Sequence, residues 1–315
     1  MTASIAPTRR PVSLVDLGSL LFLGGVWGAA FLFLRIAAPE VGPVWAAEIR
    51  LLIGASLLVL IAGRRTLAAA RGRIATFLLV GTLFSAVPFT LIAIAEVTLP
   101  AGFTSLLNAA TPLFTAAIAI AFFGQRIGPR VAAGLAVGVV AVVVLVGFSP
   151  FEMGITTLLA VAAGLGAPLS YAVAGNVVRA RLAGVEPLVL ATGMLVAGAL
   201  VAFPVALLSG APRVPATDGL VSLIAVGTLS TALAWPIFFR VLRRTTPTAA
   251  STVTFVVPAF ALTWGSIVLA EPIGLGLVVG FGLILVSLVL VLGIVPARRP
   301  TLLVRAQALA HAVLG

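Results

Sequence analysis

The stretch SLLNAATPLFTAAIAIAFFGQRIG (105–128) is matched 146 residues later by STVTFVVPAFALTWGSIVLAEPIG (251–274), with a serine, a proline, a phenylalanine and an Ile-Gly pair in one register. The correspondence runs without a gap over 81–148 and 227–294, where several glycines also coincide. Upstream, Arg35 and Pro43 correspond to Arg179 and Pro187 at an offset of 144. The chain therefore contains two copies of one unit, which we place at 16–150 and 151–296.

The composition is that of an integral membrane protein. Hydrophobic residues make up 62% of the 315 residues and charged residues 9%, whereas a soluble domain has about 25% charged residues. The alternating ten-residue segments of a membrane β-barrel are absent, so the fold class is all-α. The chain has no cysteine, which excludes disulfides, thiolate metal sites and cysteine catalysis. We expect neither a metal nor a cofactor.

Ten segments are long and apolar enough to cross a bilayer, which takes about 20 residues. The first apolar run is too long for the core of a signal peptide, so we interpret it as an uncleaved first span. Proline, glycine and arginine divide the chain into the spans 16–38, 43–62, 74–96, 100–122, 129–148, 155–178, 187–208, 217–240, 246–269 and 273–295.

The basic residues predict the orientation. All 19 are arginine, and cytoplasmic loops carry an excess of positive charge. A cytoplasmic N-terminus leaves only Arg35, Arg50 and Arg213 off the cytoplasmic side. We therefore expect both tails, 1–15 and 297–315, in the cytoplasm of a bacterium, with the spans in its inner membrane. The net charge of +11 reflects this topology, and we expect no nucleic-acid partner.

Five spans in each copy make the two repeats inverted, because an odd number of crossings reverses the direction of the second copy. Inverted repeats are typical of secondary transporters, which bind substrate between the halves near mid-membrane. The sequence thus predicts ten transmembrane helices arranged as two inverted five-helix repeats. The oligomeric state stays open.

Two further motifs, GGVWGAAFLFLRIA (24–37) and AAEIRLLIGASLLVL (46–60), accompany the two proline-containing stretches. Together they make the chain resemble the EamA-type branch of the drug/metabolite transporter superfamily over nearly its whole length. The resemblance implies a ten-helix carrier of small metabolites, with exporters of amino acids as the first candidates. One departure is Gln125, where the family often has glutamate.

The candidate substrate path follows from two mid-span prolines and from deep aromatic residues. A proline inside a helix frees a backbone carbonyl, which a membrane tolerates beside a water-filled cavity. Polar side chains precede both prolines, Ser251 and Thr252 among them. Aromatic walls with few charges suit an amphipathic substrate. The path candidates are Trp27, Asn108, Thr111, Pro112, Tyr171, Trp235, Thr254, Pro258 and Trp264.

Each candidate has a simpler interpretation. Serine and threonine often bond a carbonyl of their own helix, and a deep aromatic ring can be plain packing, as we expect for Phe84, Phe89 and Phe103.

Three charged residues are embedded in the first two spans. At about 1.5 Å per residue, Glu48 and Arg50 lie roughly 7.5 Å and 10 Å beyond Pro43, and such charges usually face the bundle interior. Arg35 lies at a depth similar to that of Glu48, so we predict an ion pair between them. The alternative for both arginines is snorkelling to the headgroups. A direct role of Glu48 in proton coupling or amine binding stays open beside structural pairing.

The function that the sequence favours is a secondary transporter, most simply an exporter of neutral or aromatic amino acids. Its partners are a small-molecule substrate, the lipid bilayer and a proton as candidate coupling ion. The chain has no lysine for a Walker loop, and no pore loop typical of channels. The alternative is a multidrug, quaternary-ammonium or lipid exporter. An intramembrane enzyme is a distant alternative, because Glu48 is the one deep carboxylate that the sequence suggests.

Overall fold

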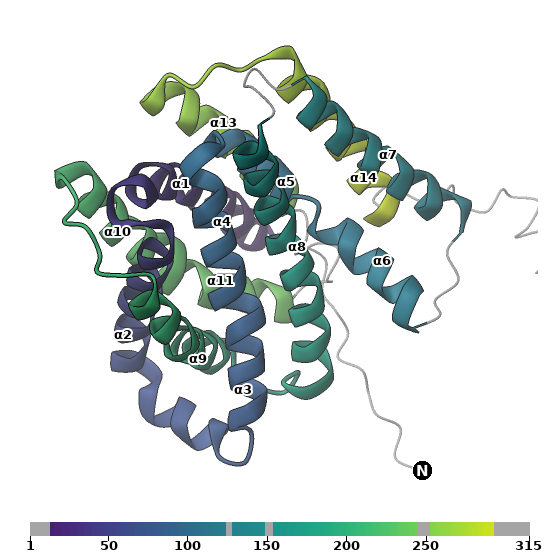
Figure 1. Ribbon diagram of the computed structural model, residues 1–315. Coiled ribbons are helices and arrows are strands. Elements are labelled where there is room, and N and C mark those ends of the chain that lie inside the picture. Colours follow the sequence, from purple (N-terminus) through teal and green to yellow (C-terminus); the bar gives the residue numbers. More distant parts are fainter. Residues whose placement is uncertain (1–12, 124–127, 149–153, 245–252, 293–315) are drawn as a thin grey trace, which may run out of the picture.

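The computed structural model describes residues 13–123, 128–148, 154–244 and 253–292, and all regular structure in these ranges is helical (Figure 1). Nine apolar helices there are long enough to span a membrane, and Val253–Leu269 is one residue shorter than the shortest of them. The predicted all-α membrane fold is confirmed. Residues 1–12 and 297–315 of the two tails, together with Gln125, Ser251 and Thr252, lie outside the described residues.

The helices follow the predicted spans in order. Several spans consist of more than one helical segment, as described below. The elements are α1 (Leu14–Val41), α2 (Pro43–Ala70), α3 (Ile74–Gly81), η1 (Thr82–Ala86), α4 (Val87–Thr98), α5 (Ala101–Asn108), α6 (Thr111–Phe123), α7 (Pro129–Gly147), α8 (Ile155–Arg181), α9 (Pro187–Leu208), α10 (Thr217–Gly227), η2 (Thr228–Leu233), α11 (Ala234–Arg244), α13 (Val253–Leu269) and α14 (Leu275–Leu292).

Some boundaries differ from the prediction. Helix α2 continues to Ala70 instead of ending near residue 62, because Arg64 and Arg65 are good helix formers and break only the apolar run. Helix α1 begins at Leu14 behind a capping box made by Ser13 and Asp16, which satisfies the first backbone donors.

The packing repeats between the two copies. Helix α2 packs along α9, its counterpart in the second copy, and α7 packs along α14 in the same way. Helix α1 packs on α13, and its counterpart α8 packs on α5 and α6. Figure 1 shows α7 and α14 side by side at one edge of the bundle. Helices of one copy therefore bury their apolar faces against helices of the other copy.

Each copy also contains a π-helical segment at the same place. Gly81 is followed by η1 and Gly227 by η2, and π-helical turns often occur at functional sites. Both glycines allow close helix contact. A Cβ at Gly81 would lie 2.6 Å from the backbone nitrogen of Gly198, and one at Gly227 would lie 2.6 Å from Cβ of Ile53.

Gly81→Ala is expected to destabilise the fold by about 1–3 kcal/mol, the usual cost of overpacking, because the obstructing atoms belong to the backbone of α9. The measurement is thermal unfolding of the purified protein in detergent, followed by tryptophan fluorescence. Gly282→Ala in α14 is the control, since nothing lies within 4 Å of its Cβ position. Equal midpoints for the two variants would contradict the close approach of α3 and α9.

Candidate substrate cavity

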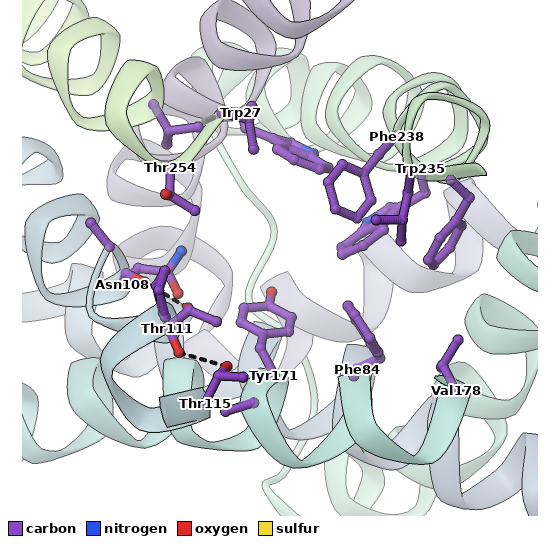
Figure 2. Close-up of a pocket in the computed structure, with 18 of the residues that line it drawn as sticks. Trp27, Phe84, Asn108, Thr111, Thr115, Tyr171, Val178, Trp235, Phe238 and Thr254 are labelled. Atoms are coloured by element: carbon purple, nitrogen blue, oxygen red, sulfur yellow. Dashed lines mark hydrogen bonds between the residues drawn. The ribbon is translucent and has the colours of Figure 1, made fainter. Parts of the chain in front are cut away.

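A cavity of about 1340 Å³ lies between the two repeats. Its walls come from α1, α2, η1, α4, α5, α6, α8, α9, α11, α13 and α14. Eight of the nine path candidates line it: Trp27, Asn108, Thr111, Pro112, Tyr171, Trp235, Thr254 and Pro258. Their part in transport stays a prediction, but the structure brings them together around one space (Figure 2).

Trp264 is the path candidate that does not line this cavity. Its ring stacks on Phe260 with centroids 6.2 Å apart, and its Nε1 donates a hydrogen bond of 3.2 Å to the carbonyl of Gly25 in α1. The residue therefore ties α13 to α1. Depth in the span could be predicted from the sequence, but the direction in which the ring points depends on the rotation of α13.

One wall of the cavity is aromatic. Trp235 has Trp27 at 5.2 Å and Phe84 at 5.3 Å between ring centroids, and Tyr171 at 6.4 Å. Phe84, which we interpreted as packing, lines the cavity as well. Phe238 and Phe239 were missed because they lie on the first turns of α11, where the sequence offered only an apolar run. Figure 2 shows the hydroxyl of Tyr171 directed into the space between the walls.

The opposite wall carries hydroxyl and amide groups at a broken helix. The fourth span is interrupted at Ala109 and Ala110, between α5 and α6, so Pro112 lies in the first turn of α6 and not in the middle of a helix. Thr111 donates to the carbonyl of Asn108 at 2.8 Å, and Thr115 donates to that of Thr111 at 2.9 Å (Figure 2). These two threonines thus satisfy carbonyls next to the break.

The second proline does not break its helix. Pro258 lies inside α13, which continues to Leu269. The two mid-span prolines therefore lie next to a helix break in one copy and inside an uninterrupted helix in the other. Discontinuous helices beside a substrate site are a recurring device of secondary transporters.

Two polar atoms of the cavity residues have no hydrogen-bond partner in the part of the chain that the structure describes. They are the Oδ1 acceptor of Asn108 and the Nε1 donor of Trp235. Buried polar groups are normally satisfied, so a ligand that contacts these two residues would supply the partner that each atom lacks.

A family model described as the EamA-like transporter family matches residues 17–147 and 158–293. The chain belongs to this family. The two matches coincide with the two repeats, which confirms the resemblance seen in the sequence. The EamA-like family consists of transporters, and transport is therefore the class of function that the match supports. No curated protein matches the chain.

The fold has a counterpart among solved structures. A protein described only as "Crystal structure of protein" superposes with a TM-score of 0.61 over 95% of this chain and 99% of its own, at 17% identity. At that identity the likeness shows the fold alone.

The predicted ion pair between Glu48 and Arg35 is wrong in this EamA-like transporter. Arg35 Nε lies 3.4 Å from Oε1 of Glu271, and its NH1 donates to the carbonyls of Glu96 and Val97 at 2.7 and 2.9 Å. The last carbonyls of α4 have no partner within the helix and attract a cation. The face of α1 that carries Arg35 is turned toward these carbonyls. The carboxylate oxygens of Glu48 are buried without a described partner.

Glu271 joins the two copies at this point. Its carboxylate accepts hydrogen bonds of 3.1 and 3.2 Å from the backbone nitrogen of Ala101, the first residue of α5. A carboxylate is favourable at a helix N-terminus. We call Arg35, Glu96, Glu271 and Ala101 the Arg35 cluster. None of these four residues lines the cavity, although their neighbours Leu34 and Ile92 do.

Glu96 was missed by the sequence reading, which considered Glu48 the one deep carboxylate. Glu96 is fully buried in α4 beside Thr104, and it lies within electrostatic range of Arg35 and Glu271. An acidic residue inside a long apolar span was the signal that could have found it.

Arg50 is the embedded charge that reaches the cavity. Its side chain is 4% exposed and lines the cavity wall, so it does not snorkel to the headgroups. Nε donates 2.8 Å to Oγ1 of Thr231 in η2. The guanidinium carbon lies 3.7 Å from the centre of the Phe89 ring, a cation–π arrangement.

Proposed function

We propose that this EamA-like protein is a secondary transporter that exports small amphipathic metabolites, with neutral or aromatic amino acids as first candidates. The observation that supports this most is the cavity between the repeats, with one aromatic wall and one wall of amide and hydroxyl groups. Such a lining packs on the apolar part of a solute and orients its polar part.

The proposed mechanism is alternating access in the cytoplasmic membrane of a bacterium. One end of the cavity is lined by Arg179, Arg243 and Arg244, which the positive-inside rule assigns to the cytoplasm. The Arg35 cluster joins the end of α4 to the beginning of α5, and we propose that it closes the cavity on the opposite side. Substrate would enter between the arginines and leave once the Arg35 cluster separates, which is the order required of an exporter.

The alternative is an exporter of drug cations. Aromatic rings can hold a cation, but four arginines line this cavity and its described lining contains no aspartate or glutamate. This observation ranks drug cations below zwitterions. A lipid substrate ranks lower as well, because one wall of the cavity carries polar groups.

The test is counterflow in proteoliposomes loaded with threonine, homoserine, aromatic or branched-chain amino acids. Saturable uptake of labelled amino acid, inhibited by the same compounds, is the expected result. Absence of counterflow from a folded, inserted protein, together with uptake of a drug cation or lipid analogue, would replace the proposal by its alternative.

Glu48 supports the proposal that a proton is the coupling ion. Glu48→Gln is expected to abolish transport driven by a pH gradient while leaving counterflow intact, because exchange needs no net proton movement. The measurement is uptake with and without an imposed gradient. Glu96→Gln serves as comparison, since Glu96 is also buried without a described hydrogen bond. If uptake by Glu48→Gln depended on the pH gradient as it does in the wild type, Glu48 would not be the proton-coupling residue.

A further inference from the structure

Arg50 is a cation held inside the bundle without a carboxylate. Arginine stays charged in proteins, and a buried charge is costly unless it is paired. Within the described ranges the ion pairs are Arg35 with Glu271 and Arg65 with Glu186, so Arg50 belongs to neither. Its positive charge is met by a hydroxyl and an aromatic face, which compensate it only in part.

The contacts of Arg50 hold the guanidinium in one orientation. Thr231 donates its own proton to the carbonyl of Val226, five residues earlier in the π-helical turn, at 2.7 Å. Its oxygen is therefore fixed as the acceptor for Nε of Arg50. Phe89 supports one face of the guanidinium. A guanidinium fixed through Nε keeps its two terminal nitrogens for a bidentate partner, the geometry in which arginine binds carboxylates.

The remainder of the cavity has the same sign of charge. Four arginines line it (Arg50, Arg179, Arg243 and Arg244), and no acidic residue does so among the residues described. A low-dielectric cleft lined by one sign of charge concentrates ligands of the opposite sign. The three exposed arginines at the mouth and the buried one further in thus favour entry of an anionic group.

The neighbours of Arg50 suit the rest of such a ligand. Tyr171 lies within electrostatic range of the guanidinium, and Tyr171 and Trp235 belong to the aromatic wall. The unpaired donor of Trp235 and the unpaired acceptor of Asn108 belong to residues that line the same cavity. An acceptor without a partner matches an ammonium or hydroxyl group.

We propose that Arg50 binds the carboxylate of the transported molecule, so that the substrate is an amphipathic carboxylate whose apolar part packs on the aromatic wall. The inference rests on the proposed transport function and adds the substrate class to it. Binding in the cavity then requires the free carboxylate of the substrate and does not require its amine. Arg50 is the residue that determines this specificity.

The test compares three ligands that differ at the carboxylate, namely phenylalanine, phenylalaninamide and phenylethylamine. Binding to the wild-type chain in detergent is followed by quenching of tryptophan fluorescence, and transport by inhibition of counterflow. We expect the two ligands without a carboxylate to bind about 10- to 100-fold more weakly, the range for a lost charge-assisted hydrogen-bonded pair. This comparison needs no variant, so it is independent of folding.

Variants then assign the preference to Arg50. Arg50→Gln is expected to bind phenylalanine and phenylalaninamide with similar affinity. Arg50→Lys is expected to keep the preference but to bind phenylalanine more weakly than wild type, since an ammonium lacks the planar fork. Arg64→Gln, on the same helix but exposed and outside the cavity lining, is the control and keeps the wild-type ratio.

The outcomes separate the inference from the proposed function. Equal binding of all three ligands by the wild-type chain, with counterflow intact, would overturn the role of Arg50 and leave the transporter standing. A preference for the carboxylate that survives in Arg50→Gln would do the same. Failure of every ligand to bind or exchange would instead overturn the proposed function.

Discussion

Glu271→Ala is expected to open the cavity on the side that the Arg35 cluster is proposed to close. The substitution removes the ion pair with Arg35 and the acceptor of the Ala101 backbone nitrogen, a loss of about 1–3 kcal/mol. An equilibrium shifted by that amount changes about 5- to 150-fold. Because the chain has no native cysteine, a single Thr115→Cys in the cavity can report accessibility. A membrane-impermeant maleimide is expected to label it from one side in the parent and from both sides in Glu271→Ala.

The control for this experiment is Glu186→Ala. Glu186 pairs with Arg65 at 3.3 Å, but both side chains are about half exposed, and such surface pairs contribute little. Labelling should stay one-sided in this variant. If Glu271→Ala were also labelled from one side only, the Arg35 cluster would not be what closes that end.

Trp235→Ala is expected to produce the largest loss of stability among the cavity residues. Six aromatic rings surround Trp235, with centroid distances from 5.2 to 6.4 Å: Trp27, Phe84, Phe89, Tyr171, Phe238 and Phe239. Removing a buried tryptophan costs about 3–5 kcal/mol in soluble proteins. We expect about 3 kcal/mol here, since lipid offers less hydrophobic driving force than water. Denaturant titration in mixed micelles measures the change.

Trp235→Phe separates the ring from its N–H. The indole nitrogen has no described hydrogen-bond partner, so its loss leaves nothing unpaired in the protein. We expect this variant to lose less than Trp235→Ala, because a six-membered ring stays in the cluster and the residual cavity is smaller. Trp45→Ala is the comparison outside the cavity, because Trp45 has one aromatic neighbour, Phe203 at 6.5 Å, and a bond to the Gly210 carbonyl. A larger loss for Trp45→Ala would contradict the central position of Trp235.

The spans could be predicted from the sequence because each is a local apolar segment of sufficient length. The repeat could be predicted because matching residues recur at one constant offset. It also placed Asn108 and Thr111 beside the cavity, since polar side chains next to a mid-span proline need a wet or polar neighbour. The π-helical segments were not predicted. They depend on Gly81 and Gly227 meeting α9 and α2, contacts that local composition does not encode.

The partners of the embedded charges could not be predicted either. Equal depth suggested that Arg35 meets Glu48, but depth along the membrane normal does not specify the rotation of each helix. The residue that Arg35 contacts, Glu271, lies 236 positions further along the chain. Arg35 also binds the backbone carbonyl of Glu96 and not its carboxylate, a contact that residue type cannot predict.

The two copies share one arrangement of helices but differ at the position of the buried charge, Arg50. At the offset of 144, the counterpart of Arg50 is Met194, which is fully buried. A second arginine at the Met194 position would place a like charge on the helix that packs along α2. Because the two copies differ at this position, a nearly symmetrical scaffold holds a one-sided pocket, which can distinguish the two ends of an asymmetric molecule.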